Sequence, residues 1–252
     1  MTPSVRLWLV HLFNCYYLTV IPSEAKESMQ LIFATGNKGK LREAREILGP
    51  HGIEVISPYD LGLIPEQVDV EETGSTFEEN AVIKVRHLWN LTGMPCFADD
   101  SGLVVDALGG APGIYSARYA SLDGSGADHN FASNIDKLLH NLQGVTDRRA
   151  RFVCVAALVA DGQSPCGAFA RNGLRSNAEQ GALPAAKVFE GTCEGNIVYS
   201  PAGCGGFGYD PIFIADAYPD RTLAEVDENA KNAISHRGNA LAKMLEYLKE
   251  IE

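Results

Sequence analysis

The sequence has no pair of cysteines in a C-x-x-C arrangement and no cluster of histidine and cysteine with the spacing of zinc ligands. Its six cysteines are scattered along 252 residues. Several lie in apolar segments, where a reduced cysteine packs as a small hydrophobic side chain. This usage excludes a zinc module of the usual spacing and indicates reduced thiols in a cytoplasmic protein.

Positive charge is also in short supply. The chain carries 21 lysine and arginine residues against 32 aspartate and glutamate residues, a formal net charge of −11, and it has no long basic stripe. Nucleic acid is held largely through phosphate contacts, so this balance argues against DNA or RNA as a partner. A small polyanion can still bind where a few lysines converge and a divalent metal bridges the remaining charge.

Residues 1–28 contain an apolar run that resembles the core of a signal peptide but lacks its other features. Their apolar run, LWLVHLFNCYYLTVI, is interrupted by His11 and Asn14, precedes no A-x-A cleavage site and is short for a membrane span. Because Met29 directly precedes a strong strand pattern, we interpret 1–28 as an N-terminal extension that is poorly ordered or reflects a misassigned start. No membrane association is expected.

From Met29 onward the apolar residues alternate between strand and helix periodicity, with no internal repeat and no linker. Strands are predicted at 30–35, 53–57, 95–98, 103–106 and 150–160, as a pair within 188–201, and within 208–214. Helices are predicted at 38–48, from 77 to about 93, near 129–142, at 222–232 and at 237–250. This order predicts a single α/β domain over 29–252, built on one long mixed sheet flanked by helices.

A first candidate site lies between a predicted strand and a predicted helix, in the sequence TGNKGK. Free backbone N–H groups and the positive helix end suit that junction to a phosphate. The stretch combines close backbone approach, polar side chains and positive charge in Thr35, Gly36, Asn37, Lys38, Gly39 and Lys40. It is not a Walker A loop. The alternative is an ordinary helix start capped by the asparagine.

A second candidate is the pair of carboxylates Asp99 and Asp100, which follows the predicted strand 95–98 and precedes Ser101. Two like charges at the end of an apolar run are costly to desolvate. Carboxylates at such a strand end suit Mg²⁺, and one of them can accept a proton from an attacking water. The alternative is a turn in which both carboxylates accept backbone N–H bonds.

A third candidate surrounds the start of the helix predicted from residue 77. Glu71 and Glu72 precede it, and Ser75 and Thr76 with Glu78 and Glu79 form a capping-box pattern. Lys84 lies two turns into the helix and can point back toward its start. The alternatives are acidic residues that complement the helix dipole and a lysine on a solvated face.

Two further candidates lie in the last fifth of the chain. Four glycines within six residues precede or flank Phe207 and Tyr209 in GCGGFGYDP, so the backbone can approach a ligand while the rings stack on a base and Asp210 accepts a hydrogen bond. The alternative is a tight loop with its aromatic rings in the core.

The second of these candidates is a group of basic residues just before the last helix. These side chains can meet anions or the keto oxygen of a base. The alternative is that Ser235 caps the helix and the basic residues are solvated. That basic group consists of Lys231, His236 and Arg237.

Together these stretches resemble the inosine triphosphate pyrophosphatase family of non-canonical purine NTP pyrophosphatases. The resemblance is carried, in the family's order, by FATGNKGKLREAREIL, EETGSTFEENAVIKVRH, ADDSGLVVDALGGAPGIYSARYA, GGFGYDPIF and AISHRGNAL. It implies hydrolysis of ITP, dITP and XTP to the monophosphate and pyrophosphate with Mg²⁺, by a homodimer that clears deaminated purines from the nucleotide pool. It also implies an elongated α/β fold with two lobes around a central cleft.

The resemblance implies roles for individual residues. Asp100 would be the general base and, with Glu72, would hold Mg²⁺. Contacts to the triphosphate and sugar would come from the loop at 35–40 and from Lys84, Ser101 and Lys231. Phe207 would stack on the purine, and the base pocket would be lined by Asp210, His236 and Arg237. Gly208 and Tyr209 would also belong to the substrate site.

Two segments depart from the family pattern. Residues 1–28 have no counterpart, and 164–187 are longer than expected, which predicts a surface insertion. Two other functions stay open: a pyrophosphatase for modified pyrimidine or methylated nucleotides, and a nucleotide sensor without turnover. The roles of Asp99 and Asp100 are not separated, and neither the substrate ranking nor the dimer geometry follows from the sequence.

Overall fold

A computed structural model describes residues 29–124, 126–160 and 185–251. The extension predicted at 1–28 and residues 164–184 of the predicted insertion lie outside the described residues. Description resumes just before the strand that begins at Lys187.

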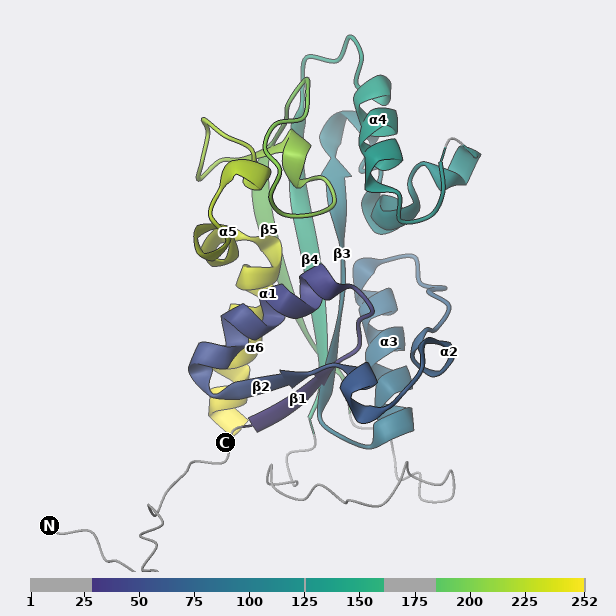
Figure 1. Ribbon diagram of the computed structural model, residues 1–252, viewed down its shortest axis with the longest axis vertical. Helices are drawn as coiled ribbons and strands as arrows, with labels where there is room; N and C mark the ends of the chain where they lie inside the picture. The colour runs from purple at the N-terminus through teal and green to yellow at the C-terminus, as the bar shows by residue number, and fades with distance from the viewer. Residues whose placement is uncertain (1–28, 125, 161–184, 252) are drawn as a thin grey trace, which may run out of the picture.

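One mixed sheet of six strands organises the fold, in the order β2-β1-β3-β4-β5-β6 (Figure 1). The strands are β1 (Met29–Phe33), β2 (Ile53–Ile56), β3 (Cys96–Val105), β4 (Arg149–Val159), β5 (Lys187–Ile197) and β6 (Phe213–Ala215). β1 runs parallel to β2 and β3, whereas the pairs from β3 to β6 are antiparallel. The predicted α/β class and mixed sheet are therefore confirmed.

Helices cover both faces of the sheet. They are α1 (Lys38–Leu48), α2 (Pro65–Val68), α3 (Phe77–Thr92), α4 (Phe131–Asn141), α5 (Glu228–Ile234) and α6 (His236–Ile251). α1 and α6 lie on one side of the end that carries β1 and β2, and α3 lies on the other (Figure 1). Within the described ranges, no helix is both long and apolar enough to cross a bilayer.

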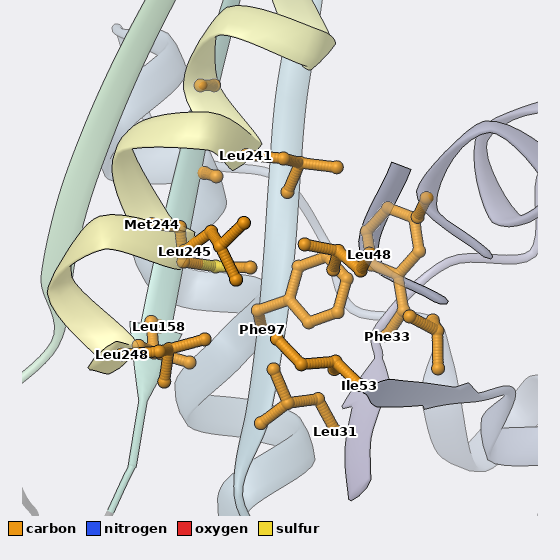
Figure 2. Close-up of a cluster of buried hydrophobic side chains, with 14 of the residues drawn as sticks. Leu31, Phe33, Leu48, Ile53, Phe97, Leu158, Leu241, Met244, Leu245 and Leu248 are labelled. Carbon is orange, nitrogen blue, oxygen red and sulfur yellow. The ribbon is translucent and has the colours of Figure 1, made fainter. Parts of the chain in front are cut away.

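Two hydrophobic clusters share one face of the sheet and are separated along the long strands. The first packs Phe33 and Phe97 in a stack with ring centroids 4.3 Å apart, under α1 and α6 (Figure 2). The second gathers Leu103, Phe152 and Phe213 toward the end that carries α4. These clusters correspond to the two predicted lobes.

The same face of β3 carries polar residues between the two clusters. Side chains two apart in a strand share a face, so Asp99 and Ser101 lie between Phe97 of the first cluster and Leu103 of the second. On the other face, Ala98 packs under α3 and is followed by Asp100. The apolar packing is thus interrupted at the middle of the longest strands.

The predicted position of the two carboxylates at a strand end is wrong. The strands predicted at 95–98 and 103–106 are one continuous strand, and Asp99 and Asp100 lie inside it, opposite Ala156 and Val155 of β4. The strand continues because side chains from other elements neutralise both charges, as shown below.

The strand pair predicted within 188–201 is also wrong, because β5 is a single strand. Its glycines are positions of close packing rather than turns. A Cβ on Gly191 would lie 2.2 Å from the His236 carbonyl oxygen of α6, and one on Gly195 would lie 2.1 Å from the Ile214 carbonyl oxygen of β6.

The helix predicted at 222–232 is divided. A short 3₁₀ turn at Leu223–Glu225 precedes extended backbone at Val226, and α5 then begins beyond Asp227. The Asp227 side chain accepts hydrogen bonds from the backbone N–H groups of Asn229 and Ala230, which fixes the helix start there.

Candidate active site

Asp99 and Asp100 point to opposite faces of the sheet and have different partners. Asp99 accepts a hydrogen bond from Lys40 Nζ at 3.0 Å and from Arg237 Nη2 at 3.0 Å. Asp100 accepts from Lys84 Nζ at 3.1 Å and from Asn80 Nδ2 at 3.3 Å. Adjacent positions in a strand thus place the two carboxylates in two separate groups of side chains.

The group around Asp99 is a buried chain of alternating charges. Arg237 also pairs with Glu43. Lys231 Nζ lies 2.9 Å from Glu43 Oε1 and 2.7 Å from Asp210 Oδ2, so it links these two carboxylates. Arg237 is only 1% exposed. These bonds connect α1, β3, α5, α6 and the glycine-rich loop, so the chain of charges fixes five segments to one another.

Electrostatics keep two members of this chain, Asp99 and Lys231, charged. Burial alone would raise the pKa of Asp99, but Lys40 and Arg237 outweigh it and hold that pKa well below its usual range. Burial likewise opposes the charge on Lys231, yet Asp210 and Glu43 raise its pKa above the ordinary value. Asp210 shifts the other way, because burial outweighs Lys231 and raises the pKa of that carboxyl. The charges of Asp99 and Lys231 therefore persist at neutral pH.

The group around Asp100 brings two carboxylates to one ammonium. Lys84 Nζ lies 2.9 Å from Glu72 Oε1 and 3.1 Å from Asp100 Oδ1, so this lysine does point back toward the start of α3 as predicted. Burial raises the pKa of Asp100 despite Lys84, whereas Lys84 outweighs burial at Glu72 and lowers that pKa. Asp100 is therefore the better proton acceptor of the two.

The loop at 35–40 adopts the predicted helix start. Asn37 Oδ1 accepts from the backbone N–H groups of Gly39 at 2.8 Å and Lys40 at 3.2 Å, and Thr35 Oγ1 accepts from the Asn37 N–H at 3.1 Å. Lys38 is exposed, whereas Lys40 turns toward Asp99. Gly36 leaves room for a neighbouring ring: a Cβ there would lie 3.1 Å from the hydroxyl of Tyr59.

The glycine-rich loop lies against the first turn of α1. A Cβ on Gly39 would lie 3.0 Å from the ring of half-buried Phe207, and Lys231 Nζ stands 4.9 Å from the centroid of that ring. Asp210 accepts from the Phe207 N–H at 2.8 Å and so fixes the loop. Two motifs that are about 170 residues apart in the sequence therefore meet at the start of α1.

Tyr209 has a different environment from Phe207. It is 3% exposed within the second cluster, and its hydroxyl donates to the Ser116 carbonyl oxygen at 2.9 Å. For this ring the core alternative fits the geometry. Gly208, between the two rings, has φ +65°, a conformation that favours glycine and lets successive side chains diverge.

The basic residues before the last helix are buried rather than solvated. Lys231, His236 and Arg237 are 4%, 7% and 1% exposed, which contradicts the solvated alternative. Ser235 does cap α6, because its Oγ accepts from the Gly238 N–H at 2.9 Å. Arg237 Nη2 also donates to Ser101 Oγ at 3.1 Å, which links this group to β3.

His236 carries an unsatisfied polar atom. Its ring stacks on Phe152 with centroids 4.8 Å apart, and its Nδ1 has no hydrogen-bond partner within the described part of the chain. Burial, together with Arg237 and Lys231, lowers the pKa of His236 well below its ordinary value. The imidazole is therefore neutral at pH 7, with a ring nitrogen available to a ligand.

A neutral buried His236 makes stability depend on pH. The unfolded chain takes up a proton near pH 6.5 and the folded chain does not, so stability present above that pH is lost as pH falls. Between pH 7.5 and pH 5.5 the loss from this one group is about 1.4 kcal/mol. Urea denaturation measures the free energy of unfolding of the wild type and of His236→Phe, a variant that keeps an aromatic ring on Phe152. Between pH 7.5 and pH 5.5 the wild type should lose about 1.4 kcal/mol more than the variant. Equal losses in the two proteins would show that another group takes up the proton.

Sequence reasoning missed two residues of these groups, Glu43 and Asn80. Both are buried polar residues on helices: Glu43 is 4% exposed beside Ala44, and Asn80 is 0% exposed beside Ala81. A polar residue at the edge of an apolar helix face was the available signal, because such a side chain needs a partner when it is buried.

The group around Asp100 fits a magnesium ion. Among the described residues no cluster of three or more His, Cys, Asp or Glu could hold a metal. Mg²⁺, however, commonly takes one or two protein carboxylates and fills its other positions with water and substrate phosphates. Glu72 and Asp100, which already converge on one positive charge, match that requirement.

Comparison with known proteins agrees with this geometry. The chain matches the model of the Ham1 family over residues 31–247. A dITP/XTP pyrophosphatase of Yersinia pestis is 44% identical over 223 residues, which cover 88% of this chain and 98% of the relative. Another, of Bacillus licheniformis, is 45% identical over 217 residues, covering 85% of this chain and 95% of that relative.

A solved structure supports the same assignment. The structure of a HAM1 protein from Coxiella burnetii has a TM-score of 0.69 and 40% sequence identity, and the match covers 88% of this chain and 99% of that one. These matches confirm the resemblance drawn from the five motifs. This chain therefore belongs to the Ham1 family.

Proposed function

We propose that this protein hydrolyses ITP, dITP and XTP to the monophosphate and pyrophosphate, with Mg²⁺, and so removes deaminated purines from the nucleotide pool. The observation that carries the proposal is the convergence of Glu72 and Asp100 on Lys84. The names of the relatives, dITP/XTP pyrophosphatase, point to the same substrates.

In this mechanism Asp100 orients a water molecule and takes its proton as the water oxygen attacks the α-phosphorus. The bond between the α-phosphorus and the bridging oxygen breaks, and pyrophosphate leaves. Glu72 and Asp100 would hold Mg²⁺, which when bound offsets the charge of the phosphates. Lys84 and Lys40 add positive charge beside the reacting group, so most of the rate gain comes from positioning and electrostatics.

Base selection follows from hydrogen-bond polarity. A pocket that offers donors to a 6-keto oxygen pairs with hypoxanthine or xanthine, whereas the 6-amino group of adenine would leave those donors unpaired. The unsatisfied ring nitrogen of His236 and the ring of Phe207 support a base pocket between α6 and the glycine-rich loop. Guanine shares the 6-keto group, so its rejection must involve its 2-amino group.

The decisive experiment is hydrolysis of dITP with and without Mg²⁺, with dATP and dGTP as controls. We expect equal amounts of pyrophosphate and dIMP, dependent on Mg²⁺, and much slower turnover of both controls. A panel of modified pyrimidine and methylated nucleotides tests the rival pyrophosphatase. Preferred turnover of one of those, or binding of dITP without any product, would overturn the proposal.

The remaining properties of this proposal concern the whole protein. We propose a homodimer in the cytoplasm, with a nucleoside triphosphate as its ligand and with neither nucleic acid nor membrane as a partner. The site is assigned to a single domain over 29–252. The net charge of −11 supports the exclusion of nucleic acid.

A further inference from the structure

Asn80 is completely buried, and its side chain bridges two parts of the candidate site. Its Nδ2 donates to Asp100 Oδ2 at 3.3 Å, and its Oδ1 accepts from the Gly74 N–H at 2.8 Å. Its exposed fraction is 0%. One amide therefore connects β3 with the segment that enters α3.

The same segment carries Glu72, two residues before Gly74. The backbone of Gly74 packs tightly against Asn80, because a Cβ on Gly74 would lie 2.6 Å from Asn80 Oδ1. Ser75 adds a second attachment, since its N–H donates to Glu79 Oε2 at 2.6 Å. The backbone that presents Glu72 is thus held against the first turn of α3.

α3 also controls the orientation of the Asp100 carboxylate. Asn80 and Lys84 are four residues apart and so lie on one face of the helix. Lys84 contacts Oδ1 of Asp100, whereas Asn80 contacts Oδ2. Each carboxylate oxygen has its own donor, so the rotation of the carboxylate about the Cβ–Cγ bond of Asp100 is fixed.

We propose that Asn80 is a positioning residue that holds Glu72 and Asp100 in the arrangement needed to bind the divalent metal. The side-chain amide of Asn80 offers a donor to Asp100 and an acceptor to Gly74 at the same time. The inference rests on the proposed function, because it takes these two carboxylates as the metal ligands. Partners of metal ligands typically contribute about 10- to 100-fold to metal affinity or activity.

A purely structural role predicts a different result. A buried asparagine that only satisfies backbone groups would lower thermal stability when removed and leave metal affinity unchanged. Asn134 of α4 supplies the matched control, because it is also 0% exposed and also bonds to backbone groups, accepting from the Ala120 N–H at 2.7 Å and donating to the Ala117 carbonyl at 3.0 Å. It lies in the other half of the molecule, next to the second cluster.

The test compares Asn80→Ala and Asn80→Leu with Asn134→Ala in the full chain. Mn²⁺ affinity is measured by electron paramagnetic resonance in the presence of dIMP, without turnover and well below each melting temperature. The Mg²⁺ concentration for half-maximal dITP hydrolysis is measured separately. We expect both Asn80 variants to bind Mn²⁺ about 10- to 100-fold more weakly, and kcat to recover partly at high Mg²⁺. Asn134→Ala should lose stability and keep wild-type Mn²⁺ affinity.

The outcomes separate this inference from the proposed function. Asn80→Leu fills the space of the amide, so it keeps the test valid if the cavity left by alanine prevents folding. Wild-type Mn²⁺ affinity in a folded Asn80 variant would overturn the positioning role while leaving dITP hydrolysis by the wild type intact. Failure of the wild type to hydrolyse dITP would overturn both, whereas a wild type that hydrolyses dITP but does not bind Mn²⁺ with dIMP would overturn the positioning role alone.

Discussion

Replacing Asp100 with asparagine is expected to lower kcat for dITP by about three to four orders of magnitude, because general-base catalysis commonly contributes about 10²- to 10⁴-fold and this residue would also hold the metal. The amide has nearly the same shape, but its one oxygen can accept from only one of the two donors, Lys84 Nζ or Asn80 Nδ2, and its own N–H group faces the other. The folded state should survive, with a free energy of unfolding about 1–3 kcal/mol below that of the wild type, because one buried donor loses its acceptor.

The measurement is pyrophosphate release at saturating dITP and Mg²⁺, together with circular dichroism and thermal unfolding. Asp147→Asn is the matched control, because Asp147 is an exposed aspartate whose partner is the exposed Arg149. That control should keep wild-type kcat. A folded Asp100→Asn variant with near-normal turnover would remove Asp100 from the role of base.

Local patterns in the sequence were sufficient for the elements that end on local signals. The helix predicted at 38–48 has the observed bounds, because Asn37 caps its start and Gly49 follows its end. α3 begins after Thr76, whose Oγ1 accepts from the Glu79 N–H at 3.1 Å, and ends before Gly93 in the left-handed conformation. The carboxylate of Glu79 reaches the Ser75 N–H, one residue earlier than a standard capping box.

The strand predictions at 95–106 and 188–201 were wrong because the residues that determine the structure there are far away in the sequence. A strand passes through Asp99 because Arg237, 138 positions later, neutralises it, and no local pattern carries that information. The glycine at 191 resembles a turn residue, yet it is required by the close approach of α6. Tertiary contacts overrode the local preference in both cases.

The candidate site was predicted as a set of residues but not as two separate groups. Motif order identified Asp99, Asp100, Lys84 and Arg237 without indicating which of them meet. The alternation of side chains along β3 divides them, with Asp99 on the side of α6 and Asp100 on the side of α3. The division gives the two neighbouring carboxylates different partners, and the consequence for stability can be measured.

Asp99→Ala is expected to lower the free energy of unfolding by about 3–5 kcal/mol, because it leaves the fully buried guanidinium of Arg237 and the ammonium of Lys40 without their shared partner. Urea denaturation at pH 7 measures this loss. Asp220→Ala is the matched control, since Asp220 pairs with Arg221 at 2.7 Å on the surface and its loss should cost less than about 1 kcal/mol.

The pH dependence and a double variant test the cause of this loss. The pKa of Asp99 lies below its value in the unfolded chain, so its contribution is present above about pH 4 and is lost as pH falls further. The difference in the free energy of unfolding between Asp99→Ala and the wild type should therefore become smaller as the pH falls below about 4. Adding Arg237→Met removes the guanidinium that has lost one of its two carboxylate partners, so the double variant should be more stable than the sum of the single losses by about 0.5–3 kcal/mol. Strictly additive losses would mean that Asp99 and Arg237 act independently, and the buried chain of charges would not be what joins α6 to β3.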